Sequence, residues 1–248
     1  MGTHRVKPIL DFGFIQVPTF YLVISLSITF VLLLVNAELN QNPKIDRKIT
    51  FDIALIIMLT GFVGGRLAHV FYEEFAFYQE FPLEVFKFWK GGFVFYGGFI
   101  LSLISVFAYL RAKKQNFYFW ADFLTPYLAL SYALGRIGCF FEGCCYGTHC
   151  ELPWAVAGRH PTQLYMVVAE LILIMGIVLF SRSRKLTTGL VFLMWVCGHS
   201  INRFVIEFYR EDDRGALIMN LSISQILSAL LFLGALYQIK KLLNFARN

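Results

Sequence analysis

Residues 18–36 read PTFYLVISLSITFVLLLVN, a stretch without a charged side chain. A helix that crosses the hydrocarbon core of a bilayer needs about 20 predominantly apolar residues. The stretch is close to that length, and it is longer than the roughly 7–15 residues of the apolar part of a cleaved signal peptide. We therefore predict a membrane-spanning helix that stays in the protein.

Similar apolar stretches follow along the rest of the chain. The seven predicted spans are residues 18–36, 49–72, 93–110, 121–140, 161–180, 189–209 and 221–239. They are continuously apolar, whereas the strands of a transmembrane barrel alternate with a period of two residues. The chain has no internal repeat and no long linker. The sequence thus predicts an all-α, polytopic membrane protein in which residues 1–248 form one domain.

The composition supports a membrane protein. Hydrophobic residues make up 58% of the 248 residues and charged residues 15%, and the mean hydropathy is +0.63. A single water-soluble core cannot bury that much apolar surface, which excludes a soluble single-domain enzyme. The 22 Lys and Arg exceed the 16 Asp and Glu. A nucleic-acid-binding face needs a soluble scaffold to present it, so we expect no nucleic-acid partner.

The distribution of the cations predicts the orientation. Twelve Lys and Arg follow spans one, three, five and seven, whereas seven lie on the opposite side of the membrane. Cytoplasmic loops carry an excess of Lys and Arg. We therefore expect the N-terminus outside and the C-terminus in the cytoplasm.

Three arginines, Arg66, Arg136 and Arg203, fall inside predicted spans. An arginine at the centre of the bilayer costs about 2.5–3.5 kcal/mol on insertion scales, so each needs a partner or a function. In the predicted orientation all three lie near the outer ends of spans two, four and six. Guanidinium groups bind phosphate in bidentate fashion, which indicates a phospholipid headgroup site at the outer leaflet. The alternative is that the arginines extend to the interface, with Arg203 paired to Glu207.

Other polar residues within the spans have structural interpretations. Glu170, well inside span five, is either a hydrogen-bonded tie between helices or a catalytic group. Asp52 and Asp122 stand at the beginnings of spans two and four, where capping of their own helices would explain them. The glycines of residues 61–65 and 97–98 allow helices to approach closely.

Two motifs resemble the signature of the bacterial prolipoprotein diacylglyceryl transferases. They are GRIGCFFEGCCYG at residues 135–147 and RHPTQLY at residues 159–165. Shorter agreements occur at residues 65–67, 91–98, 203–210 and 225–227, in the family's order. The resemblance extends from about residue 13 to residue 240 and covers nearly the whole chain.

The resemblance implies an enzyme of the bacterial cytoplasmic membrane with its active site facing the outer leaflet. Such enzymes transfer the diacylglyceryl group of phosphatidylglycerol to the lipobox cysteine in the signal peptide of a preprolipoprotein. A thioether forms and glycerol phosphate is released. The scheme needs no metal or other cofactor.

The resemblance also implies the site residues. The expected catalytic residues are Arg136, Arg203, Glu207 and Tyr96. The expected phosphatidylglycerol-binding residues are Arg136, Arg66, Gly147, His160, Gln163 and Tyr21. Tyr21 is adjacent to Phe20, which occupies the position of the family's tyrosine in span one.

The chain also departs from the family pattern. Tyr96 stands where well-studied members have a histidine that is a proposed general base, and an unperturbed tyrosine titrates near 10. The alternative proton acceptors are Glu207, His160 and the phospholipid itself. Only residues 148–158 separate the two motifs, where many members insert a larger domain. Two other functions therefore stay open: transfer of the lipid group to another acceptor, and non-catalytic lipid binding or transport.

The segment after residue 143 is rich in potential soft ligands. Cys144, Cys145, His149 and Cys150 lie within seven residues, but their spacing matches no standard zinc finger. The sequence leaves three interpretations open, namely a metal site, a disulfide between Cys150 and one of the paired cysteines, or free thiols.

Overall fold

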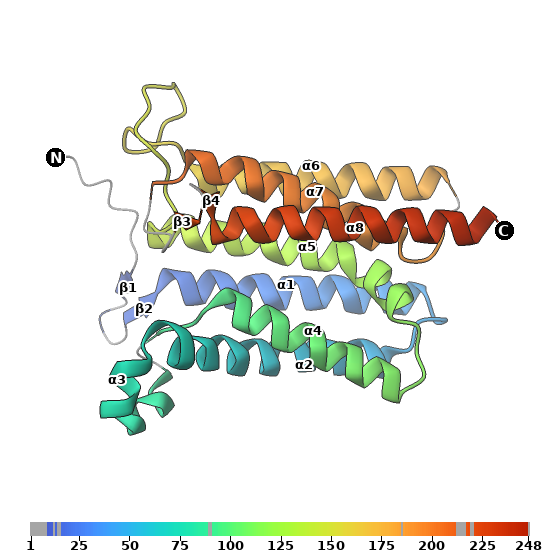
Figure 1. Cartoon of the computed structure of the whole chain (residues 1–248), viewed down its shortest axis with the longest axis horizontal. Helices are drawn as coiled ribbons and strands as arrows, with labels where there is room; N and C mark the ends of the chain where they lie inside the picture. Colours follow the sequence, from blue (N-terminus) through green and yellow to red (C-terminus); the bar gives the residue numbers. More distant parts are fainter. Residues whose placement is uncertain are drawn as a thin grey trace. The chain divides into compact units, whose positions relative to one another are not determined.

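The computed structural model describes residues 9–11, 13, 16–88, 91–184, 186–211, 217–218 and 221–247. The chain is predominantly helical (Figure 1). It divides into two compact units, the first formed by Met1–Asn36 and Tyr118–Asn248 and the second by Ala37–Phe117. The predicted single domain stays a prediction, and each unit is described by itself.

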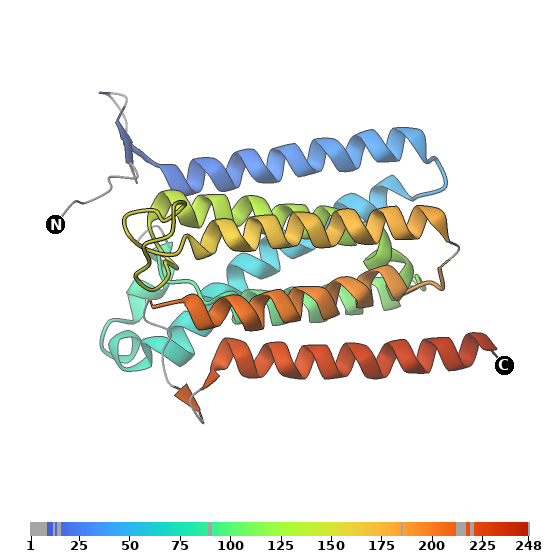
Figure 2. The same ribbon diagram turned by 90° about the horizontal axis from the view of Figure 1, so that it is seen from above.

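The first unit contains four long helices and most of a fifth. They are α5 (Phe117–Glu142), α6 (Thr162–Ser183), α7 (Leu190–Ile206), α8 (Ile223–Arg247) and α1 (Thr19–Gln41). Helix α7 packs against both α6 and α8 (Figure 2). A 3-10 turn, η4 (Glu207–Tyr209), continues α7.

Two short antiparallel ribbons accompany these helices. Strand β1 (Ile9–Asp11) pairs with β2 (Gln16–Pro18), with Leu10 opposite Val17. Strand β3 (Leu217–Ile218) pairs with β4 (Leu221–Ser222), which leads directly into α8. The predicted all-α fold class is therefore confirmed, because all the long elements are helices and the strands are only two or three residues long.

The second unit is built on the packing of α2 (Arg47–Ala68) against α4 (Phe95–Ala112). Asp46 caps α2 by accepting a hydrogen bond from the Ile49 amide at 3.0 Å. The helix continues into one π-helical turn, η1 (His69–Glu73). After η1 the structure has α3 (Phe75–Glu80) and the 3-10 turn η2 (Pro82–Phe86), a segment in which no helix was predicted from the sequence.

Two aspartates have roles other than the expected capping of their own helices. The Asp122 carboxylate on α5 accepts hydrogen bonds from the amides of Gly189 at 2.5 Å and Phe192 at 2.8 Å, so it caps α7. Asp52 on α2 accepts a hydrogen bond from the Tyr109 hydroxyl on α4 at 2.5 Å. Both residues therefore tie two helices together.

Helices lie at all seven predicted spans, as expected for a membrane protein. Five helical segments are long and apolar enough to cross a membrane: Thr19–Gln41, Arg47–Glu73, Thr162–Ser183, Leu190–Tyr209 and Ile223–Phe245. Gly97–Ala112 is apolar but shorter, and α5 is not among the five. Large apolar side chains such as Leu33, Ile172 and Leu233 are more than 60% exposed, as expected for surfaces that face lipid.

Close packing of α2 on α4 depends on glycine, as predicted for these positions. A Cβ added at Gly64 would lie 2.5 Å from the Gly97 carbonyl oxygen and 2.8 Å from the Leu101 Cβ. A Cβ at Gly98 would lie 2.5 Å from the Gly61 carbonyl oxygen. Backbone atoms cannot move aside as the end of a side chain can, so the helices would have to separate.

Gly64→Ala is expected to destabilise the protein by about 1–3 kcal/mol, the usual cost of forcing extra atoms into a packed contact. Gly176→Ala is the matched control, because no atom lies within 4 Å of a Cβ added there in α6. Thermal unfolding in detergent should show a lower melting temperature for Gly64→Ala than for Gly176→Ala. Equal melting temperatures would show that the contact between α2 and α4 can relax without cost.

Candidate functional site

Several chain segments of the first unit meet at one end of its helices. The loop of residues 143–161 connects α5 to α6, and its Thr148 amide donates a hydrogen bond to the Tyr209 carbonyl at 2.8 Å. Ser224 at the start of α8 accepts a hydrogen bond from Arg203 of α7 at 3.1 Å. The end of α5, the start of α6, the end of α7 and the start of α8 thus lie together (Figure 2). Arg136 and Arg203 therefore lie at the same end of their helices, as the sequence predicts.

Arg136 lies near the end of α5 and has a neutral partner. Its Nε and Nη2 atoms both donate hydrogen bonds to the Tyr132 hydroxyl, at 3.0 and 2.7 Å, and its guanidinium carbon lies 4.9 Å from the centre of the Tyr132 ring. Within the described residues no carboxylate pairs with Arg136. The spacing of four residues places both side chains on one face of the helix. Tyr132 was not predicted, although this spacing could have indicated it.

Glu207 is the centre of a buried ionic network. Its Oε2 atom lies 2.9 Å from Nη2 of Arg203 and 3.2 Å from Nη1 of Arg210. Its Oε1 atom accepts a hydrogen bond from the Ser222 hydroxyl at 2.9 Å, and only 1% of its side chain is exposed. The pairing of Arg203 with Glu207, one alternative from the sequence, is confirmed. Arg210 was predicted as an outer-side cation and not as a member of the site.

Among the described residues, this cluster holds more guanidinium groups than carboxylates. The guanidinium of Arg203 interacts electrostatically with those of Arg136 and Arg210 and with the Glu207 carboxylate. Glu207 pairs directly with Arg203 and Arg210, whereas Arg136 pairs with Tyr132. The guanidiniums of Arg210 and Arg136 also act on the Cys145 thiol. Such an arrangement is suited to binding an anion.

The loop of residues 143–161 is fastened to this cluster at Gly147. The Gly147 amide donates a hydrogen bond to the His160 carbonyl at 3.0 Å, and Gly147 pairs with Arg210 in an isolated bridge. A Cβ added at Gly147 would lie 2.6 Å from the His160 Cβ and 2.7 Å from the Tyr209 carbonyl oxygen. Only glycine permits that approach. This contact explains the glycine at this position of the motif, and its predicted role in binding lipid stays a prediction.

The RHPTQLY motif holds the loop from the side of α6. The Gln163 amide donates to the Cys144 carbonyl and the Thr162 hydroxyl to the Cys145 carbonyl, each at 2.5 Å. His160 Nδ1 lies 3.0 Å from the Tyr165 hydroxyl, and its ring lies against that of Tyr209. Gln163 is 4% exposed. The contacts given for Gln163 are therefore those of a residue that anchors the loop.

A second buried polar group adjoins Tyr132. Glu170 on α6 is fully buried, accepts a hydrogen bond from Trp195 Nε1 at 3.0 Å and lies 2.7 Å from His199 Nδ1. The His199 ring meets the Tyr132 ring edge-on at 4.7 Å. Glu170 is thus a tie between α6 and α7, one of the two roles expected for it. A histidine and tryptophan four residues apart on one helix are the signal that the sequence analysis missed.

Cysteines lie beside the arginines. The pKa of the Cys145 thiol in the loop is lowered by hydrogen bonding from Cys139 and Cys144, and further by the charges of Arg210 and Arg136. The pKa of Cys144 is raised by its hydrogen bonding with the other two thiols and by burial. All five cysteines are free thiols, so of the three interpretations left open by the sequence the disulfide with Cys150 is not formed.

Arg66 lies in the second unit and is engaged by backbone. Its guanidinium donates to the carbonyls of Val85 at 3.0 Å, Glu84 at 2.7 Å, Gly91 at 2.6 Å and Gly92 at 3.3 Å. The side chain is 7% exposed. These four hydrogen bonds hold the segment between η2 and α4, a connection that the sequence alone does not reveal.

The remaining predicted site residues are tyrosines. Tyr21 is 51% exposed near the start of α1 and contacts Phe20 edge-on. Tyr96 lies in the first turn of α4, and its side chain is outside the described part of the structure. Their predicted roles stay predictions.

The fold and this cluster define a helical membrane protein with a partly buried cationic site at one end of its helices. The family model for prolipoprotein diacylglyceryl transferase matches residues 7–240. The chain belongs to the prolipoprotein diacylglyceryl transferase family.

Curated relatives agree with this assignment, and each is called a phosphatidylglycerol–prolipoprotein diacylglyceryl transferase. The protein of Bordetella avium (strain 197N) is 31% identical over 239 residues, covering 92% of this chain and 90% of the relative. That of Methylococcus capsulatus is 35% identical, covering 77% of this chain and 76% of the relative. That of Nitrosospira multiformis is 32% identical, covering 89% and 80%. The resemblance inferred from the motifs is therefore confirmed.

Proposed function

We propose that this chain transfers the diacylglyceryl group of phosphatidylglycerol to the lipobox cysteine thiol of preprolipoproteins. The family and the names of the relatives support the reaction. The observation that points to particular residues is the grouping of Arg136 and Arg210 with Arg203, whose guanidinium pairs with Glu207. A phosphodiester is the anion that this reaction requires the site to bind.

The chemistry explains why arginines suit this site. The cysteine sulfur forms a bond to the glycerol carbon while the bond from that carbon to the phosphate oxygen breaks. Glycerol phosphate leaves with one more negative charge than the phosphodiester had. Fixed cations stabilise a charge that develops in the transition state. In enzymes that use such groups, removing one of them lowers the reaction rate about 10²–10³-fold. Arg136 and Arg203 are the residues we assign to this role.

Glu207 is assigned an orienting role. Two guanidiniums and the Ser222 hydroxyl already engage both of its oxygens. A carboxylate bound in this way fixes the direction in which Arg203 and Arg210 point. The thiol proton then passes to another acceptor, for which His160, Tyr96 and the phospholipid phosphate are the candidates.

The proposal includes an arrangement in the membrane. Seven spans, with the N-terminus outside, place the ends of α5 and α7 and the starts of α6 and α8 at the outer leaflet. The twelve cations that follow odd-numbered spans, against seven on the other side, support this orientation. Phosphatidylglycerol and a signal peptide would reach the site from that leaflet. His160, Gln163, Gly147, Tyr21 and Arg66 would complete the site or support it.

The proposal is tested in a host depleted of its own transferase and supplied with this chain. The mass of a reporter lipoprotein, measured after membrane expression has been verified, should increase by one diacylglyceryl group. An unmodified reporter in the presence of the folded protein would refute the proposed transfer.

Tyr96→Phe removes a hydroxyl that we expect to donate a hydrogen bond to the phosphate. A hydrogen bond to a charged group is worth about 1.5–3 kcal/mol, so the rate of reporter modification should fall by roughly 10- to 100-fold. Tyr237→Phe is the matched control, since Tyr237 lies on α8 and is 66% exposed. Undiminished modification by Tyr96→Phe would remove Tyr96 from the site, as hydrogen-bond donor and as proton acceptor alike.

A further inference from the structure

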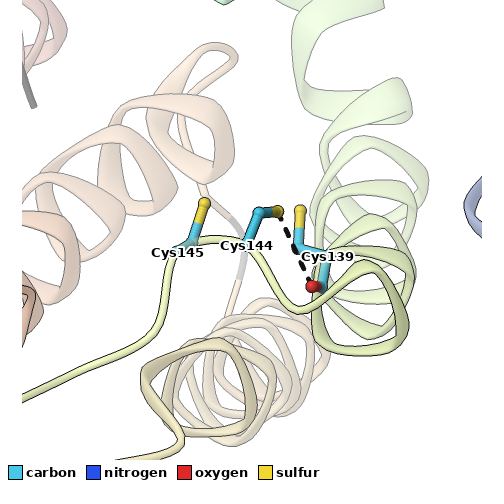
Figure 3. Close-up of side chains that lie close together, drawn as sticks. All are labelled: Cys139, Cys144 and Cys145. Carbon is cyan, nitrogen blue, oxygen red and sulfur yellow. Dashed lines mark hydrogen bonds between the residues drawn. The ribbon is translucent and has the colours of Figure 1, made fainter. Parts of the chain in front are cut away.

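Three cysteines converge where α5 ends. Cys139 lies in the last turn of α5, and Cys144 and Cys145 lie in the loop that follows (Figure 3). Their sulfur atoms all lie within 4.8 Å of one another, and each residue is half-buried. The Cys144 thiol is oriented toward the end of α5, where it donates a hydrogen bond to the Cys139 carbonyl at 3.6 Å. Cys150, which the sequence analysis grouped with the paired cysteines, is not part of this cluster.

The surrounding chain holds the cluster in this shape. Cys145 has a φ of +61°, a left-handed conformation that costs a residue other than glycine of order 1–3 kcal/mol unless its surroundings enforce it. Thr162 and Gln163 at the start of α6 enforce it by binding the carbonyls of Cys145 and Cys144. On the other side, the Cys144 amide donates to the Cys139 carbonyl at 3.2 Å. The backbone therefore brings three sulfur atoms together at the cost of local strain.

We propose that Cys139, Cys144 and Cys145 form a three-thiolate site for a soft metal ion, Zn²⁺ or Cu⁺. Thiolate sulfur is the ligand that selects these two ions. Metal–sulfur bonds of about 2.3 Å around a tetrahedral ion place sulfur atoms roughly 3.8 Å apart. Each pair in the cluster therefore needs to close by about 1 Å at most to ligate one ion. Cu⁺ would use the three sulfurs alone, and Zn²⁺ would take a fourth ligand.

The charges near the cluster favour the bound state. Binding exchanges three S–H bonds for three metal–sulfur bonds and releases the protons to solvent. Three thiolates carry more negative charge than either ion neutralises, and the guanidiniums of Arg210 and Arg136 act on Cys145 from close by. A disulfide would join only two of the three thiols and would give the third thiol no role. The site would clip the loop of residues 143–161 to the end of α5, a role that goes beyond the transfer reaction.

Metal binding by the purified full-length chain tests the proposal. Under anaerobic conditions, Co²⁺ serves as the spectroscopic probe of a zinc site, and Cu⁺ is titrated against a chromogenic chelator. We expect one ion per chain, with binding weakened at least 100-fold by Cys139→Ser, Cys144→Ser or Cys145→Ser. Cys150→Ser and Cys197→Ser are the matched controls and should bind like the unaltered chain.

A second measurement uses the unaltered chain and does not depend on the folding of any variant. Bound Zn²⁺ or Cu⁺ should protect three thiols from maleimide labelling, and peptide mass spectrometry should assign them to residues 139, 144 and 145. Labelling that neither ion changes would overturn the proposal. So would a disulfide among these three residues in chain purified without reductant. Neither readout depends on lipid transfer, so its outcome is separate from that of the proposed function.

Discussion

Arg136→Gln is expected to abolish lipid transfer, with a loss of at least 100-fold in the rate of reporter modification. Arg136 contributes positive charge to the cluster and has a phenol as its partner, so its charge is available to a phosphate. Losing one fixed group that stabilises a developing charge costs about 10²–10³ in rate. Mass spectrometry of a reporter lipoprotein, with protein amounts equalised, measures the loss.

Two further variants make this result specific. Arg136→Lys keeps the charge but loses the planar fork that binds two oxygens at once, so it should retain only part of the activity. Arg182→Gln makes the same change in the last turn of α6, at the far end from the site, and should leave the rate unchanged. Activity in Arg136→Gln equal to that of Arg182→Gln would contradict the headgroup assignment.

Glu207→Gln is expected to have the largest effect on stability. It removes the carboxylate that compensates Arg203 and Arg210 while leaving both guanidiniums in place. Breaking a buried ion pair by removing one partner costs about 3–5 kcal/mol, because an uncompensated charge remains. For a chain of this size, each kcal/mol lost from the free energy of unfolding lowers the melting temperature by roughly 2–4 °C. The melting temperature in detergent should therefore fall by about 10 °C.

A double variant that also changes Arg210 tests whether Glu207 stabilises the protein through these ion pairs. Glu207→Gln combined with Arg210→Gln removes one of the two guanidiniums that the Glu207 carboxylate compensates, so the double variant should be more stable than Glu207→Gln alone. Glu151→Gln, an exposed position in the loop of residues 143–161, is the matched control. A melting temperature of Glu207→Gln equal to that of Glu151→Gln would show that Glu207 does not compensate these arginines.

The long helices and one ion pair follow from local sequence. Continuous apolar stretches of about 20 residues predict spans because lipid leaves no other way to satisfy the backbone. Arg203 and Glu207 are four residues apart, and that spacing alone predicts their pairing. Close helix approach at Gly64 and Gly98 is likewise visible in the pattern of small residues.

Partners that are distant in the sequence could not be predicted. Asp122 caps a helix that begins 68 residues later, at Leu190, instead of its own. Arg66 binds backbone carbonyls of residues 84–92, and no side-chain pattern indicates such partners. Cys139, Cys144 and Cys145 are close in sequence, but their convergence depends on the course of the loop, in which Cys145 adopts a left-handed conformation. In each case the three-dimensional fold determines the partner, and the residue type shows only that a partner is needed.

Transfer by the purified chain is the most direct test of the function. The protein is reconstituted into vesicles that contain phosphatidylglycerol and supplied with a synthetic preprolipoprotein signal peptide, and the mass of the peptide is measured. The account predicts a gain of one diacylglyceryl group, which requires phosphatidylglycerol and is lost when the lipobox cysteine is replaced by serine. A peptide of unchanged mass, in vesicles shown to hold folded protein, would contradict it.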